Sequence, residues 1–165
     1  MTIRLEDPEA RLQHARDLAW RALSRRERTE AEMARLLAGK RVEPSAIDAV
    51  VGELREQGYL DDASYAQRFA EDRRRLDAWG TDRIERRLLS LGVARELIAA
   101  ALADHSHEEE LAAARELLAR RFPGPPQTPR DRDRALAVLV RKGYDLELAY
   151  DALRAHAGVE AEPLD

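Results

Sequence analysis

The chain has 165 residues and a formal net charge of −4, and 44% of its residues are apolar although only 5% are aromatic. A chain of this length can form one compact domain or a short series of smaller units, with a core built from aliphatic side chains. The absence of cysteine excludes disulfides, thiolate metal sites and cysteine nucleophiles. An acidic total does not by itself indicate a nucleic-acid partner, so the distribution of charge along the chain is more informative.

Helical periodicity runs through most of the chain, and no segment shows sustained two-residue alternation with β-branched residues. Leu and Ala, which dominate the apolar residues, are strong helix formers. The fold class is therefore predicted to be all-α. The expected helices cover residues 8–23, 29–38, 44–57, 61–77, 81–91, 94–103, 107–121, 129–142 and 145–155.

Start signals precede several of these helices. Thr29 with Glu32, and Ser106 with Glu109, have the spacing of a capping box, in which each side chain satisfies a free backbone amide of the first turn. Asp61 precedes another helix as an N-cap. Thr128 is followed by a proline, which is favoured at the first helical position. A glycine in the left-handed conformation is expected after five helices, at Gly39, Gly58, Gly80, Gly92 and Gly143.

A repeat becomes visible when the helices are overlaid. A shift of 52 places Thr29, Leu36 and Leu37 on Thr81, Leu88 and Leu89, and a shift of 51 places Gly92 on Gly143. These matches predict three tandem three-helix repeats, and stacking of such repeats favours an elongated, curved array. We expect repeat 1 at 8–57, repeat 2 at 61–103, repeat 3 at 107–155 with a Pro-rich loop at 122–129, and tails at 1–7 and 156–165.

No combination of residues indicates catalysis. None of the four histidines lies in a recognisable triad, and the single glycines follow helices, unlike those of a phosphate-binding loop. His105 and His107 are two positions apart, whereas two metal ligands on one helical face need four. Asp61 and Asp62 are better explained as helix caps than as an acid–base pair. We therefore expect a protein that is not an enzyme and that uses no metal or cofactor.

A membrane location is not expected. The longest apolar run, residues 97–103, is too short to cross a bilayer, and residues 1–7 lack the apolar segment of a secretory signal. We expect a cytoplasmic protein.

Arginines are the strongest candidates for recognition, because the guanidinium group binds carboxylates and phosphates with two parallel hydrogen bonds. Residues 111–142 carry eight basic and three acidic side chains, whereas residues 143–165 carry one and six. This alternation fits either ordinary solvated faces or a basic stripe on equivalent helices. Trp20 and Trp79 are expected to pack in the core. The candidate binding residues are Arg73, Arg74, Arg83, Arg86, Arg87, Arg130, Arg132 and Arg134.

Several segments, taken in order, resemble the RecX family. The resemblance covers about residues 10–103 well and the third repeat less well. It rests on Ala22 to Met33, on Gly58-Tyr59-Leu60-Asp61-Asp62 with Tyr65-Ala66 and Phe69, and on Arg73, Gly80, Arg83-Ile84, Leu88 and Gly92-Val93.

The resemblance implies tandem three-helix units and a non-enzymatic regulator of the bacterial recombinase RecA. By that likeness, the chain would bind in the groove of the RecA filament on single-stranded DNA. It would inhibit ATP hydrolysis and strand exchange. We further expect a monomer, and the acidic net charge favours at most weak direct contact with the DNA. Two alternatives remain open from the residues alone: a protein that binds free single-stranded nucleic acid, and a helical scaffold for another protein.

Overall fold

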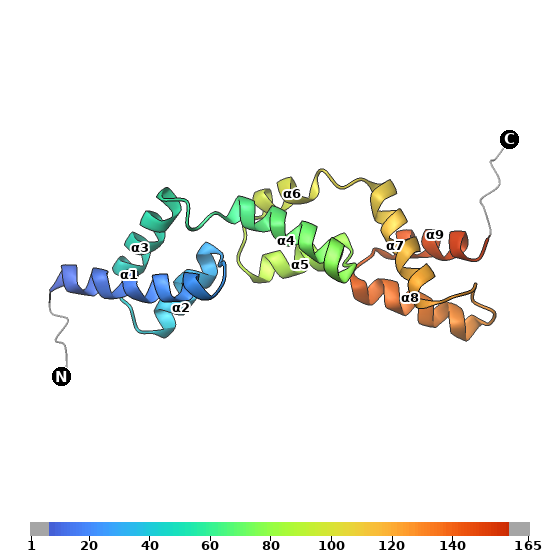
Figure 1. Ribbon diagram of the computed structural model, residues 1–165, viewed down its shortest axis with the longest axis horizontal. Helices are drawn as coiled ribbons and strands as arrows, with labels where there is room; N and C mark the ends of the chain where they lie inside the picture. The colour runs from blue at the N-terminus through green and yellow to red at the C-terminus, as the bar shows by residue number, and fades with distance from the viewer. Residues whose placement is uncertain (1–6, 159–165) are drawn as a thin grey trace. The chain divides into compact units, whose positions relative to one another are not determined.

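The structure is a computed structural model that describes residues 7–158, and Figure 1 labels its helices. This part of the chain contains nine helices and no strand, so the predicted all-α class is confirmed. The helices are α1 (Pro8–Arg25), α2 (Glu30–Gly39), α3 (Pro44–Glu56), α4 (Asp62–Asp77), α5 (Thr81–Ser90), α6 (Arg95–Leu102), α7 (His107–Arg121), α8 (Pro129–Lys142) and α9 (Leu146–His156).

Most helix starts follow from local capping, as predicted. Thr29 accepts from the amide of Glu32 while the Glu32 carboxylate accepts from the amide of Thr29, and Ser106 and Glu109 repeat this arrangement before α7. Thr128 caps α8 through the amide of Asp131. Asp61 accepts from the amide and the hydroxyl of Ser64 at the start of α4. These caps satisfy amides that have no partner inside the helix.

Left-handed backbone follows several helices, but not at every predicted glycine. Gly58, Gly92 and Gly143 have positive φ, whereas the predictions for Gly39 and Gly80 are wrong. After α2 the left-handed residue is Arg41, with φ 61°, because α2 includes Gly39 and the turn closes two residues later. Before α5 it is Ala78, with φ 54°. Gly80 is required for a different reason, which is close contact with another turn.

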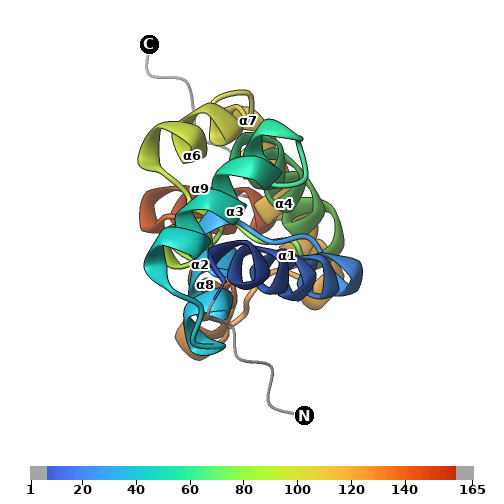
Figure 2. The same cartoon turned by 90° about the vertical axis from the view of Figure 1, so that its left-hand side faces the viewer.

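The chain divides into two compact units, and each is described by itself. The first unit comprises the chain up to Ala66 together with Leu88–Ile98, and the second comprises Gln67–Arg87 and Ala99 onward. In the first unit, α1, α2 and α3 pack around one core (Figure 2). Its fully buried members include Ala15, Ala19, Met33, Leu37 and Val50. The small alanines of α1 allow the other two helices to approach it closely.

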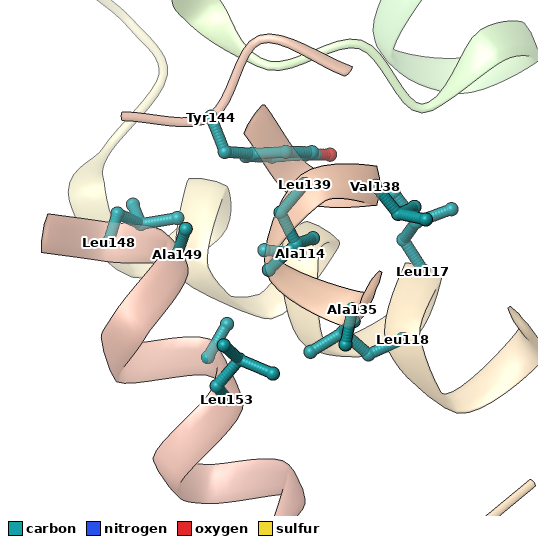
Figure 3. Close-up of a cluster of buried hydrophobic side chains, with 11 residues drawn as sticks. Ala114, Leu117, Leu118, Ala135, Val138, Leu139, Tyr144, Leu148, Ala149 and Leu153 are labelled. Carbon is teal, nitrogen blue, oxygen red and sulfur yellow. The ribbon is translucent and has the colours of Figure 1, made fainter. Parts of the chain in front are cut away.

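The second unit has its own core, formed by α7, α8 and α9 (Figure 3). Ala114 and Leu118 of α7, Leu139 of α8, and Ala149 of α9 are inaccessible to solvent. Tyr144 covers this cluster from the α8–α9 turn and is 2% exposed. Its burial raises the pKa of the Tyr144 phenol well above the ordinary value.

The turn between the second and third helices has the same hydrogen bond in each repeat. Val42 N donates to Leu37 O, Val93 N to Leu88 O, and Tyr144 N to Leu139 O, each over 3.1 Å. These residues are related by a shift of 51 throughout. The shift of 52 proposed for Thr29 and Thr81 is therefore wrong by one residue. Thr29 corresponds to Gly80, because each accepts the first i to i+4 hydrogen bond of its helix, from Met33 and Ile84.

The tails predicted at 1–7 and 156–165 lie almost entirely outside the described residues. Of these positions only Asp7 and 156–158 are described. Asp7 caps α1 by accepting from Glu9 N, and His156 is the last residue of α9.

Candidate interaction surface

The first unit contains a contact between consecutive repeats, which we call the first joint. It joins Thr29–Ala31, at the start of α2, to Asp62 and to Leu91–Gly92. The Thr29 hydroxyl donates to Leu91 O over 2.6 Å, and Asp62 Oδ1 accepts from Glu30 N over 3.0 Å. A Cβ built on Gly92 would lie 2.3 Å from Ala31 Cβ. The first joint is therefore made mainly by side chains, and it requires glycine where the turn meets α2.

The second unit contains the equivalent contact, which we call the second joint. It joins Gly80–Arg83, at the start of α5, to Glu110 and to Lys142–Tyr144. Gly80 N donates to Lys142 O over 2.7 Å, and Asp82 N donates to Gly143 O over 3.0 Å. Lys142 corresponds to Leu91, so the same carbonyl is reached by a hydroxyl in one joint and by a backbone amide in the other. A Cβ on Gly80 would lie 2.4 Å from Gly143 O, so a glycine at this position is what lets the two backbones approach this closely.

A buried carboxylate completes the second joint. Glu110 is 7% exposed and accepts from Thr81 N over 2.7 Å and from the Thr81 hydroxyl over 3.0 Å. Thr81 corresponds to Glu30, so Glu110 caps the same amide that Asp62 caps in the first joint. His105 Nε2 lies 2.8 Å from Glu110 Oε2 without forming a hydrogen bond, and this contact becomes an ion pair only when the imidazole is protonated.

Two of the predicted binding residues, Arg73 and Arg83, converge on Trp79. The Arg83 guanidinium lies 4.1 Å from the centre of the Trp79 ring, and that of Arg73 lies 5.9 Å away. Arg83 also donates to Arg141 O over 3.1 Å, and Arg73 forms an ion pair with Asp77. Cation–π contacts of this kind are favourable when partly shielded from water. Trp79 is thus half-buried between two arginines, so its core prediction holds only in part.

The Arg74 side chain is also partly buried. Its guanidinium donates to the Thr81 hydroxyl over 3.5 Å, while its Nε is buried without a hydrogen-bond partner. Burial lowers the pKa of Arg74, and the negative charges of Glu110 and Glu109 act in the opposite direction. Arg74 and Arg83 thus have internal contacts at the second joint, and Arg73 has internal contacts beside it, with Asp77 and Trp79.

The other five predicted residues are exposed. Arg86 and Arg87 lie on α5, and Arg86 donates to the backbone carbonyl of Asp82. Arg130, Arg132 and Arg134 lie in the first two turns of α8, and none of the three pairs with an acidic residue in the described part of the chain. At 1.5 Å per residue, Arg134 is about 10 Å along α8 from Arg141, which meets the second joint. The eight candidates thus form separate groups.

The residues that make the joints were not among those predicted from the sequence. Asp62 was expected to cap its own helix, yet Asp62 and Glu110 each cap a helix of the preceding repeat. Tyr144 was not singled out, although its hydroxyl donates to the carbonyl of the left-handed Ala78 over 2.9 Å. Trp20 was expected in the core but is 42% exposed and packs edge-on against Tyr59. A shift of 51 aligns the capped residues Glu30 and Thr81, but the capping residues Asp62 and Glu110 are related by a shift of 48, so no single shift shows the repeated cap.

Metal binding and membrane insertion each require a feature that can be looked for in the described residues. Among residues 7–158, no group of three His, Cys, Asp or Glu side chains is arranged to hold a metal ion. None of the helices in this range combines the length and apolar character needed to cross a membrane.

Solved structures with a similar fold include two of RecX proteins. A crystal structure of RecX from Lactobacillus salivarius superposes with a TM-score of 0.78 and 17% identity, covering 92% of this chain and 99% of that one. A crystal structure of a regulatory protein RecX gives a TM-score of 0.75 and 22% identity, covering 89% of this chain and 73% of the other. At these identities the likeness establishes the fold, namely tandem three-helix repeats.

Sequence comparisons identify the family. Models of the first, second and third three-helix domains of RecX match residues 15–54, 61–102 and 108–153. The regulatory protein RecX of Leptothrix cholodnii is 35% identical over 136 residues, covering 82% of this chain and 85% of that protein. The regulatory protein RecX of Thermobifida fusca is 30% identical over 161 residues, covering 96% and 86%. Because these relatives match over most of their length, the chain belongs to the RecX family of regulatory proteins.

Proposed function

We propose that this protein regulates homologous recombination by binding the RecA nucleoprotein filament on single-stranded DNA and inhibiting its ATP hydrolysis and strand exchange. The proposal is supported by membership of the RecX family, whose members are named regulatory proteins. The filament carries phosphates and carboxylates, which exposed arginines bind well.

The observation that carries the proposal is the group of exposed arginines on α8. Arg130, Arg132 and Arg134 have no acidic partner in the described part of the chain, so their charges are available to an external anion. Arg86 and Arg87 add two exposed charges on α5. We assign Arg74 and Arg83 to holding the second joint and Arg73 to the adjacent end of α4, because each has contacts within the protein. The contact surface is therefore the five exposed arginines of α5 and α8.

The test is single-strand-DNA-dependent ATP hydrolysis by the RecA of the same organism, with this protein added below stoichiometry. Wild-type protein should inhibit, and charge reversal of Arg130, Arg132 and Arg134 to Glu should weaken inhibition by about tenfold or more. Reversal of Arg86 and Arg87 should have a smaller effect. The matched control reverses Arg21 and Arg25, two exposed arginines of α1, and should inhibit like the wild type.

Three outcomes would contradict the proposal. Equal inhibition by the α8 variant and the wild type would remove α8 from the contact surface. No inhibition by an excess of wild-type protein, combined with tight and salt-dependent binding of free DNA, would favour the single-strand nucleic-acid binder. The absence of both effects would favour a scaffold for another protein.

A further inference from the structure

A cavity of about 390 Å³ lies in the third repeat, between the Pro-rich loop and the start of α8. Phe122, Pro125, Pro126 and Ala135 line it, so much of its wall is apolar. His156, at the end of α9, also lines the cavity, and its Nε2 lies 3.1 Å from the carbonyl oxygen of Gly124. Cavities of this size with a few polar groups are suited to holding a ligand or an anchoring side chain.

Two arginines flank the cavity, and neither contacts another described residue through a hydrogen bond or ion pair. They are Arg121, the last residue of α7, and Arg134 of α8. Both are exposed, and Asp131 is the one acidic residue in the lining. The site is therefore cationic and apolar at once, which is an unusual combination for a surface without a function.

The repeat relation shows what this pair of arginines contacts elsewhere in the chain. Arg134 corresponds to Arg83 by the shift of 51. Arg121 corresponds to Arg73, because the buried Ala66 and Ala70 of α4 align with Ala114 and Leu118 of α7 at a shift of 48.

In the second repeat, Arg73 and Arg83 both contact the ring of Trp79. In the third repeat, the loop between Phe122 and α8 contains three prolines and no aromatic residue, and the cavity lies beside the corresponding arginines. The third repeat therefore has the equivalent pair of arginines but no counterpart of Trp79.

We propose that this cavity binds an aromatic side chain carried by an acidic segment of a partner protein. The aromatic ring would lie against Arg121 and Arg134 as Trp79 lies against Arg73 and Arg83, with Phe122 and the prolines forming the apolar wall. Flanking carboxylates would meet the two guanidinium groups, which donate to carboxylates bidentately. A protein segment fits better than a nucleic acid, because the equivalent arginine pair binds an aromatic side chain within this chain and the protein carries a net charge of −4. This site goes beyond the proposed filament contact and is testable without RecA.

The experiment is an NMR titration of the whole protein, following backbone amides and the Nε–H signals of arginine. The probes are the capped peptides EDWDE and EDLDE, which have the same charge and differ in the central aromatic ring, and a short oligothymidylate. The peptide EDWDE should shift the signals of Arg121, Arg134 and the loop at about 1 mM or below. The peptide EDLDE should bind at least about threefold more weakly, since it lacks the ring.

Two pairs of arginine substitutions test whether the peptide EDWDE binds at this cavity. Arg121→Ala and Arg134→Ala together should weaken EDWDE binding by about tenfold, because two cation–π and carboxylate contacts are lost. Arg120→Ala and Arg132→Ala together are the matched control, and should bind like the wild type with unchanged far-UV circular dichroism. The proposal is overturned by equal binding of both peptides, by equal loss in the control pair, by oligothymidylate competing for the same signals, or by no shift with EDWDE at several millimolar.

Discussion

The two joints place the same elements together with different chemistry. In the first, the Thr29 side chain reaches Leu91 O, and one oxygen of Asp62 caps Glu30 N. In the second, Gly80 and Gly143 bring two backbones into direct hydrogen bonding, and Glu110 accepts from both the amide and the hydroxyl of Thr81. The second joint also carries Trp79 with its two arginines.

The difference shows that one geometric requirement can be met by either side chains or backbone. In both joints the first amide of the second helix needs an acceptor, because it has none inside its own helix. A carboxylate from the next repeat supplies it each time. The residues around that contact differ between the two joints. We expect substitutions at the second joint to be more destabilising, because backbone contacts cannot adjust by changing a rotamer.

The glycine turns should give the largest effects. Gly143→Ala would place a Cβ 2.2 Å from Arg83 Cβ and 2.6 Å from Arg83 N, and it would also be strained by the φ of 99°. We expect a loss of about 3 kcal/mol or more in the free energy of unfolding, measured with urea. Gly58→Ala is the matched control, because φ is +80° but nothing lies within 4 Å, and it should cost about 1 kcal/mol. Equal losses at the two positions would mean that the joint is looser than described.

Gly92→Ala tests the first joint in the same way and should fall between these values. Its nearest contact is Ala31 Cβ at 2.3 Å, which is a single methyl group. The double variant Ala31→Gly with Gly92→Ala should therefore recover part of the loss, in spite of about 1 kcal/mol for glycine inside α2. If the two substitutions are simply additive, the contact between these residues is not the cause of the loss.

The buried carboxylate of the second joint should come next. Glu110→Gln keeps an acceptor for Thr81 N but removes the charge that faces the half-buried Arg74. We expect a loss of about 2 kcal/mol in thermal or urea unfolding. Glu108→Gln, an exposed neighbour in the same first turn, should change stability by less than about 0.5 kcal/mol. A Glu110 variant as stable as this control would show that the charge is not needed.

The smallest effect, and one of opposite sign, is expected for Asp62→Asn in the first joint. Burial raises the pKa of Asp62 above 3.8, so the folded state holds its proton more tightly than the unfolded state does. This contribution to stability is present below pH 3.8 and is lost as the pH rises through the raised pKa. The asparagine variant keeps the acceptor for Glu30 N and lacks the titration.

The difference in unfolding free energy between this variant and the wild type should therefore shift in favour of the variant between pH 3 and pH 7, by less than about 1 kcal/mol. A difference that stays constant with pH would show that Asp62 has an ordinary pKa in the folded protein.

Local signals explain how well the helices could be predicted. The caps at Thr29, Ser106 and Thr128 involve residues three apart, so the sequence contains both partners. The starts of α7 and α8 were predicted to the residue for this reason. The left-handed residues Arg41 and Ala78 could not be predicted, because neither residue type favours that conformation. At Ala78 the turn also depends on a distant contact, since its carbonyl accepts from the Tyr144 hydroxyl.

The contacts at the joints could not be predicted from the sequence, for a related reason. Asp62 and Glu110 stand at helix starts, where an acidic residue is already favourable by local electrostatics, so their partners 32 and 29 residues away left no separate signal. The doubled leucines at 36–37 and 88–89 also allow two overlays one residue apart, and only the turn hydrogen bonds choose between them. The candidate site was found in part, since arginine composition indicates recognition but not which arginines face inward.

Arg41 has a consequence for how copies of this protein can associate. It occupies the left-handed position that is Gly92 in the second repeat and Gly143 in the third, where glycine leaves room for a helix of the preceding repeat. A helix start from another copy, approaching this turn in the same way, would meet a charged side chain in place of a bare backbone. Head-to-tail contacts that repeat without closing lead to open-ended polymers. We therefore expect the Arg41 side chain to disfavour such growth.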